Sequence, residues 1–222
     1  MDALWIAALW ILFAATHMGL SSPRLRPRCV ARLGARGFQG VYSLLALAIF
    51  VPLVWSYYAH KHAGPYLWNL VKLPGVRWVG YAVMGAAFVL VVAGLVQPSP
   101  ASMRPGKPAV RGVARITRHP LLMGLGLWGI AHLLLAMVHA SELAFFGGFA
   151  IFAVVGCEHQ DKRKLATLGE SYRAYVAATP FLPFSSMGFA RGLVEMPMPI
   201  AIAAGIALAW ALRQYAHGWL SG

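Results

Sequence analysis

Three histidines lie within or beside the apolar stretches of this chain, and they are its best candidates for chemistry. His17 and His132 interrupt long hydrophobic runs, and His119 stands in Arg118-His119-Pro120 at the start of another run. Ionisable side chains at membrane depth are costly to bury and commonly mark functional sites. Neutral imidazole is a good ligand for transition metals and for haem iron. The three side chains therefore indicate a candidate metal or haem site.

The residues alone leave two interpretations of His17 and His132 open. Each is either a neutral imidazole hydrogen-bonded to a neighbouring helix or one member of a ligand pair. A rise of about 1.5 Å per helical residue places His17 about 6 Å and His132 about 18 Å inside the same membrane boundary. Because His119 lies near that boundary, depth alone favours His17 with His119.

Arg118 and His119 also have two interpretations. Pro120 suits the first turn of a helix, so that His119 would precede the helix as a cap-like residue. Alternatively, both side chains bind an anionic or polar group of a cofactor at the membrane surface, because a guanidinium forms strong hydrogen bonds with carboxylates. Arg104 and Lys107, in the same basic segment, are further candidates for this role.

The elements that must position these side chains are membrane-spanning helices. Hydrophobic residues make up 59% of the chain, and its mean hydropathy is +0.65. A spanning helix needs about 20 largely apolar residues. Six runs meet or approach this length: residues 3–20, 41–59, 78–96, 121–138, 143–157 and 199–216. The sequence therefore predicts one all-α domain over residues 1–222, an integral membrane bundle of about six transmembrane helices.

The net charge of +13 is concentrated between the apolar runs. All but four of the 19 Lys and Arg residues fall in residues 21–40, 97–120 and 158–197. The positive-inside rule places these segments in the cytoplasm and both termini outside. Anionic lipid headgroups account for the charge, and the lack of any recognition module in the sequence argues against nucleic acid as a partner.

The polar segments carry two further expectations. Residues 158–175 have apolar residues near helical spacing, which predicts a cytoplasmic amphipathic helix at the membrane surface. The other histidines, among them His62, His139 and His159, fall outside the apolar runs and are expected to be solvated. The sequence has no nucleotide-binding glycine loop, zinc-protease motif or nucleophile elbow. The apolar runs hold almost no Asp or Glu, which argues against an ion-coupled transporter.

Several motifs resemble the NnrU family over nearly the whole chain. They are residues 112–124 (GVARITRHPLLMG), 127–134 (LWGIAHLL), 161–164 (DKRK) and 172–175 (YRAY), together with the run through His17 and residues 31–40. The most specific part is the RHP tripeptide followed by AHL. The chain departs from the family pattern at residues 138–142, where the family commonly has a short turn.

The resemblance implies a cofactor and its ligands. NnrU proteins are associated with bacterial denitrification and nitric oxide metabolism, and their relative zeta-carotene isomerase is a haem b membrane enzyme that converts a cis double bond to trans. On this resemblance His17 and His132 are the expected iron ligands, with His119 a further matching histidine. Arg118, with Arg104 or Lys107, would pair with the haem propionates. We expect a multi-pass protein of the bacterial inner membrane that is linked to nitric oxide and denitrification metabolism or to redox-gated cis-trans isomerisation of a lipophilic polyene.

A weaker resemblance offers an alternative. The RHP tripeptide, the later Leu-Gly-x-x-Tyr-x-x-Tyr stretch and the Pro-Phe-x-Pro end are similar to isoprenylcysteine carboxyl methyltransferases, which bind S-adenosylmethionine. Leu122 stands where those enzymes usually have Tyr, and Glu158-His159 where they have a Glu pair. A third hypothesis is a non-enzymatic membrane accessory protein. The sequence leaves the substrate, the catalytic residues and the oligomeric state open.

Overall fold

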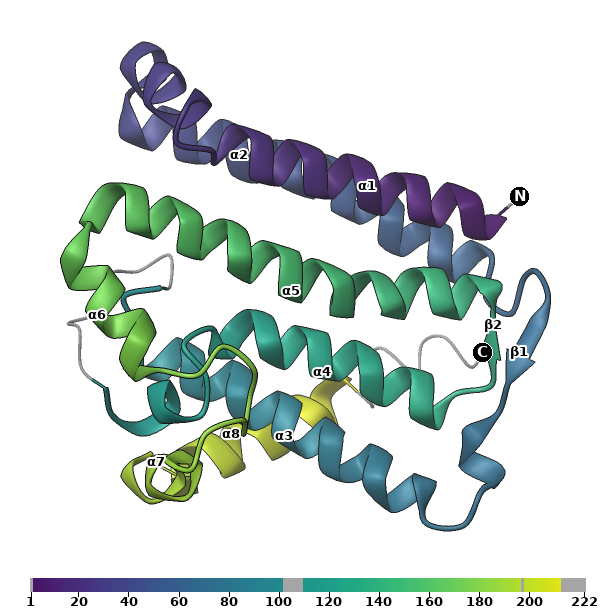
Figure 1. The fold of residues 1–222 in the computed structure, drawn as a ribbon. Coiled ribbons are helices and arrows are strands. Elements are labelled where there is room, and N and C mark those ends of the chain that lie inside the picture. The colour runs from purple at the N-terminus through teal and green to yellow at the C-terminus, as the bar shows by residue number, and fades with distance from the viewer. Residues whose placement is uncertain (1, 102–109, 197, 213–222) are drawn as a thin grey trace.

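The computed structural model describes residues 2–101, 110–196 and 198–212, and most of these residues are helical (Figure 1). The all-α prediction is confirmed. The helices are α1 (Asp2–Leu20), α2 (Leu25–Ala59), α3 (Val76–Val96), α4 (Pro120–Leu135), α5 (Ala140–Leu168), α6 (Glu170–Ala178), α7 (Phe189–Glu195) and α8 (Met198–Leu212). The 3-10 turns η1 (Leu70–Lys72) and η2 (Gly112–Arg115) and the short strands β1 (Tyr66–Trp68) and β2 (Val138–His139) complete the described elements.

Four of these helices, α1, α2, α3 and α5, are long and apolar enough to cross a membrane. The helix α4 is apolar but has 16 residues, and α8 has 15 described residues, so both are short for a spanning helix. The predicted count of six transmembrane helices is therefore not confirmed. The predicted orientation of the termini stays a prediction.

Two boundaries differ from the sequence prediction. Most of the basic segment 21–40, predicted as a loop, is the first part of α2, whose backbone departs from helical values at Gly34 (φ 69°, ψ 166°) and not at Pro52. The predicted spanning run 143–157 and the first part of the amphipathic segment form one helix, α5, which ends at Leu168. Gly169 has φ 59°, a value that glycine adopts without steric cost, and lets α6 begin in a new direction.

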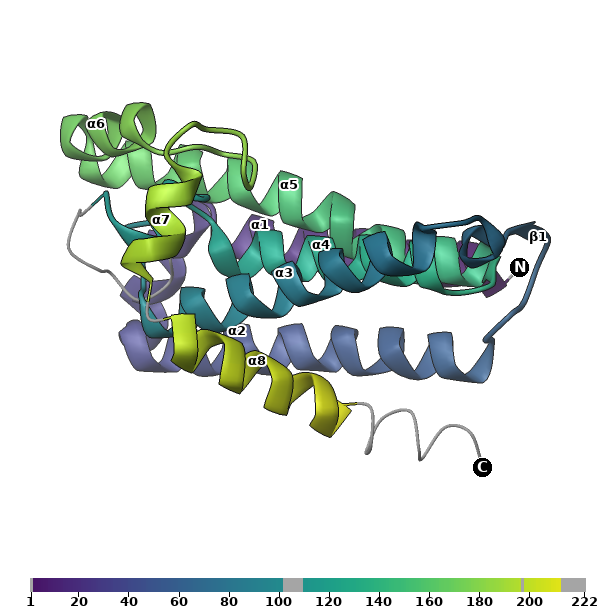
Figure 2. The same ribbon diagram turned by 90° about the horizontal axis from the view of Figure 1, so that it is seen from below.

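The helices pack in the spatial order α2, α1, α5, α4, α3, α8 (Figure 1). Seen from below, α2 and α8 lie on the same side of the helices between them (Figure 2). Small residues allow the close approaches: a Cβ added at Gly129 would collide with the Phe146 carbonyl oxygen, and one at Gly148 with the Trp10 ring. The Trp10 indole N–H donates to the Phe145 carbonyl at 3.1 Å, which joins α1 to α5.

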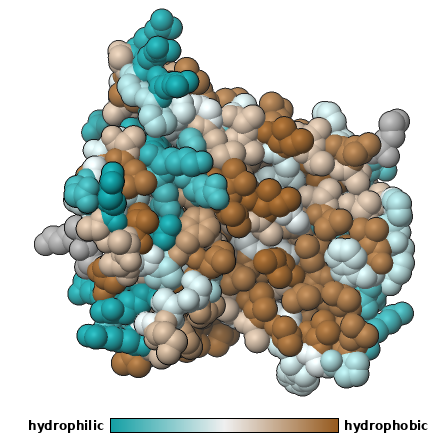
Figure 3. Space-filling model, in the orientation of Figure 1, coloured by the Kyte–Doolittle hydropathy of each residue, from teal (hydrophilic) through white to brown (hydrophobic). Residues whose placement is uncertain are grey.

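The two ends of the bundle differ in polarity. Hydrophilic side chains gather at the end that carries α6 and the start of α2, which we call the basic end, and hydrophobic ones cover most of the remaining face (Figure 3). At the other end, which we call the strand end, β1 pairs antiparallel with β2, and Tyr66 lies opposite His139. This strand pair joins the connection between α2 and α3 to the connection between α4 and α5.

A carboxylate fastens α7 to η2 near the basic end. Glu195 accepts hydrogen bonds from the backbone N–H of Gly112 at 2.9 Å, from Arg115 Nε at 2.9 Å and from Arg191 Nε at 2.8 Å. These donors lower the pKa of Glu195 to about 2. The Gly112 N–H has the largest effect, and the Arg115 guanidinium has the next largest. The carboxylate is therefore charged over the whole physiological range.

Candidate functional site

Arg118 and His119 meet a buried carboxylate. The helix α5 places Asp161 beside them, and α6 adds a tyrosine hydroxyl. Arg118 donates to Asp161 Oδ2 from Nε at 2.9 Å and from Nη2 at 2.8 Å, His119 Nε2 donates to Oδ1 at 2.8 Å, and the Tyr172 hydroxyl donates to Oδ1 at 2.6 Å. Arg118 Nη1 donates to the Thr179 carbonyl at 3.0 Å. We call these five residues the Asp161 cluster.

The Asp161 cluster ties the start of α4 to α5 and α6. Its ionisable groups are nearly removed from solvent: the side chains of Arg118 and Asp161 are 11% and 12% exposed, and that of His119 is 0% exposed. Burial, together with the hydrogen bond to Asp161, raises the pKa of Tyr172 above its ordinary value, so this hydroxyl remains a donor. Buried charges are tolerated when they are paired and hydrogen-bonded in this way.

The structure therefore gives Arg118 and His119 partners within the protein. The Arg118 guanidinium uses its Nε and both terminal nitrogens on Asp161 and Thr179. Binding of a cofactor carboxylate by Arg118 would compete with Asp161, and this role stays a prediction. The predicted roles of Arg104 and Lys107 fall outside the described residues.

His17 lies elsewhere, in a cavity of about 250 Å³ near the basic end, which we call the polar cavity. The centroid of its ring lies 5.2 Å from that of Phe13 and 4.7 Å from that of Tyr42. His17 Nδ1 is buried and has no hydrogen-bond partner in the structure. Such an orphaned nitrogen is unusual, because buried polar atoms are normally satisfied. The His17 ring lines the cavity, but its Nδ1 atom is closed to solvent, so the ring would have to turn to present this nitrogen to a ligand.

The polar cavity is also lined by cationic and polar side chains from α1, α2 and α5. They include Arg26, His159 and Arg163, and no carboxylate is among the lining residues. His159 Nε2 lies 3.0 Å from the Ser21 hydroxyl. A cavity with two arginines and no acid suits a ligand that carries a negative charge.

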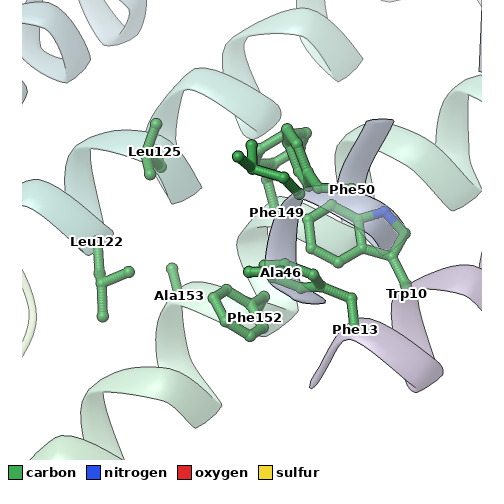
Figure 4. A pocket seen from close by; sticks show the side chains of 10 residues that line it. Trp10, Phe13, Ala46, Phe50, Leu122, Leu125, Phe149, Phe152 and Ala153 are labelled. Carbon is green, nitrogen blue, oxygen red and sulfur yellow. The ribbon is translucent and has the colours of Figure 1, made fainter. Parts of the chain in front are cut away.

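A second cavity of about 270 Å³ adjoins the polar cavity, and we call it the apolar cavity (Figure 4). Side chains of α1, α2, α4 and α5 line it, and all are apolar or aromatic: Trp10, Phe13, Ala46, Leu47, Phe50, Leu122, Leu125, Phe149, Phe152 and Ala153. Phe13 also stacks on His17, and both Leu122 and Phe152 line the two cavities together. A lipophilic molecule in the apolar cavity would therefore lie close to His17.

The helix α5 shows how far apart the three predicted histidines lie. His132 stacks on Phe146 at 4.4 Å, His17 contacts the Phe152 ring at 5.8 Å, and His119 contacts Asp161. The six residues from 146 to 152 correspond to about 9 Å of helix, and the nine from 152 to 161 to about 13 Å. Along α5, His17 thus lies between His132 and His119, and which pair of histidines binds iron stays a prediction.

His132 has a defined orientation but lines neither of the two cavities described above. Its Nδ1 donates to the Trp128 carbonyl at 2.9 Å. A metal-binding imidazole commonly donates its other N–H to a backbone carbonyl, which fixes the tautomer. The structure thus brings none of the three predicted histidines into direct contact with another, and the ligand pair His17 and His132 stays a prediction.

The cavity residues Arg26, Tyr42, His159 and Arg163 were missed as a group by sequence reasoning. His159 was expected to be solvated. A signal was available on α5, since residues 152, 156, 159, 160 and 163 all line the polar cavity at helical spacing. This spacing is informative only when the apolar run 143–157 and the polar segment after it are known to form one helix.

Comparisons with known proteins identify related sequences. The chain is 27% identical over 191 residues to 15-cis-zeta-carotene isomerase, chloroplastic, of Arabidopsis thaliana, and 25% identical over 191 residues to that of Zea mays. Each match covers 81% of this chain and 49% of the relative, so the chain spans about half the length of these curated relatives. No solved structure matches. The profile of the NnrU protein family matches residues 5–222, and the chain therefore belongs to the NnrU family.

Proposed function

We propose that the chain is a haem b-binding membrane protein that catalyses cis-trans isomerisation of a lipophilic polyene. The observation that carries the proposal is the orphaned His17 nitrogen in a basic cavity that adjoins an apolar one. The names of the two curated relatives support the reaction class. Because the chain spans about half the length of those relatives, their activity is a proposal for this chain.

The described residues fit haem b in part. His17 has an imidazole nitrogen without a partner, which a turn of the ring would present to the iron, and Arg26 and Arg163 offer guanidinium groups for the two propionates. Each cavity alone is smaller than the roughly 300–1,000 Å³ typical of ligand sites. The two together fall within that range, and movement of Leu122 and Phe152 would join them into one site, with haem toward the polar cavity and the polyene toward the apolar cavity. His132 is retained as the proposed second ligand because of the family resemblance alone.

The apolar cavity would hold the substrate. Its aromatic rings from α1, α2 and α5 offer flat apolar surfaces, and a conjugated hydrocarbon needs no hydrogen bond. When bound, haem would supply a redox-active iron centre for the reaction with the polyene or nitric oxide. We further propose that the protein resides in a bacterial inner membrane, with the basic end in the cytoplasm.

The first experiment tests the haem ligand. Wild-type protein purified from haem-replete cells is expected to show a Soret band, which His17→Ala should shift or abolish. The matched control is His60→Ala, because His60 lies outside both cavities and its Nδ1 is 2.8 Å from the Ser56 carbonyl. A parallel His132→Ala variant tests the second ligand. A wild type without a Soret band, or a band unchanged in His17→Ala, would refute the proposed haem site.

The second experiment tests the substrate cavity. Ala46→Phe adds a ring to the apolar cavity, and Ala46 does not line the polar cavity. We expect this variant to retain haem and to lose isomerisation of 15-cis-zeta-carotene in detergent or liposomes. Wild-type haem binding without turnover would favour the accessory-protein hypothesis. Tight binding of S-adenosylmethionine in calorimetry, without haem, would favour methyl transfer.

A further inference from the structure

Three ligand-type side chains converge at the strand end, far from the two cavities along the bundle. His62 follows α2, His139 belongs to β2, and Glu142 lies in the first turn of α5. His62 Nδ1 is 3.3 Å from Glu142 Oε1, and His139 Nδ1 is 3.5 Å from Glu142 Oε2. One potential ligand atom from each residue lies within 4.8 Å of the other two.

Hydrogen bonding explains the position of Glu142 and, in part, that of His139, which is the N-cap residue of α5 and whose side chain faces the Glu142 backbone N–H in a capping-box arrangement. The carboxylate is 1% exposed and accepts the backbone N–H groups of His62 and His139, each at 2.9 Å. Both imidazole nitrogens stay beyond the roughly 2.7–2.9 Å of a charge-assisted hydrogen bond. His139 Nδ1 is buried and has no hydrogen-bond partner. The two imidazoles thus face the Glu142 carboxylate at distances longer than those of strong hydrogen bonds.

The same distances suit a metal ion. Zinc binds histidine nitrogen and carboxylate oxygen at about 2.0–2.2 Å in tetrahedral geometry. For bonds of this length, two ligand atoms of a tetrahedron are about 3.3–3.6 Å apart. The two measured separations, 3.3 Å to Oε1 and 3.5 Å to Oε2, fall in this range, and a small rotation of the carboxylate would let one oxygen share an ion with both imidazoles. A buried carboxylate that faces two imidazoles would also be neutralised by a divalent cation.

We infer that His62, His139 and Glu142 form a binding site for a divalent transition-metal ion of the zinc class. His62 has a side chain that is 47% exposed, so ions can enter from its side and water can fill the remaining coordination position. The bound ion would join the segment after α2 to the turn between α4 and α5, alongside the pairing of β1 with β2. The inference does not depend on the proposed function.

The test is zinc binding by full-length protein without a polyhistidine tag. After treatment with a chelator, the protein in detergent is titrated with zinc chloride against a chromophoric competitor, and its thermal unfolding is recorded with and without zinc. We expect one saturable site in the wild type and a higher melting temperature with zinc. His62→Ala and His139→Ala should each weaken binding by at least about tenfold.

Two control variants accompany this test. His60→Ala is the matched control: it removes a histidine from the same segment, and zinc affinity should not change. His17→Ala should also leave the strand-end site intact, which keeps this result separate from the haem experiments. Because His62 is half exposed, its truncation should not impair folding. Wild-type protein without a saturable site, or equal affinity in wild type and His62→Ala, would overturn the inference.

Discussion

The substitution Asp161→Asn tests the Asp161 cluster most directly. It keeps the shape of the side chain but removes the charge opposite Arg118, whose Nε and Nη2 donate to Asp161 at 2.9 Å and 2.8 Å. Breaking a buried ion pair by removing one partner costs about 3–5 kcal/mol, because the other charge is left unpaired. The two side chains are only 11% and 12% exposed, so solvent screening reduces this value little. We therefore expect a loss of about 3–5 kcal/mol.

The assay is thermal unfolding in detergent, followed by tryptophan fluorescence. For a chain of this size, each 1 kcal/mol lowers the melting temperature by about 2–4 °C, so Asp161→Asn should lower it by about 6–20 °C. The matched control is Glu170→Gln, which breaks the exposed ion pair with Arg173. That pair should contribute about 0–1 kcal/mol.

A double replacement separates the lost attraction from the unpaired charge. Arg118→Leu with Asp161→Leu removes both charges, and its cost should be smaller than the sum of the two single replacements. A melting temperature for Asp161→Asn that matches the Glu170→Gln control would refute the reasoning. Strictly additive costs in the double replacement would show that the two side chains are not coupled.

Three further predictions follow from other contacts. Tyr172→Phe removes one hydrogen bond to the same carboxylate and should cost about 1.5–3 kcal/mol in the same thermal assay, less than Asp161→Asn; a cost of zero would contradict this. Gly129→Ala should destabilise by about 1–3 kcal/mol, since its Cβ would meet backbone, whereas Gly147→Ala, with its nearest atom at 3.5 Å, should be tolerated. Glu195 has a pKa of about 2, lowered from 4.5, so its stabilisation of α7 is complete above about pH 4.5 and is lost as the pH falls toward 2. Pepsin cleavage near α7 should rise across that window in the wild type and show no such transition in Glu195→Gln.

Apolar periodicity located most of the helices. The predicted run 3–20 matches Asp2–Leu20, and 78–96 matches Val76–Val96, because a long apolar run bounded by polar residues permits one interpretation. The basic residues before Val41 do not indicate a single structure, since exposed arginines are equally compatible with a helix or a loop. Hydropathy therefore did not indicate that α2 begins at Leu25.

The sites were predictable only where a single segment carries the information. His17 was selected because it interrupts an apolar run, and the structure places it in a cavity. The partner of Arg118 lies 43 residues away on another helix, and no local pattern pairs the two. The site at the strand end likewise joins His62 to Glu142 across 80 residues, which requires the tertiary structure.

The sequence separation between Arg118 and Asp161 has a consequence for how the protein is made. A growing chain exposes Arg118 and His119 to the insertion machinery 43 and 42 residues before their carboxylate is synthesised. During that interval α4 has an unpaired guanidinium at its start, and its 16 residues alone give it weak anchoring. Truncated chains that end before α5 should therefore be targets for membrane proteases.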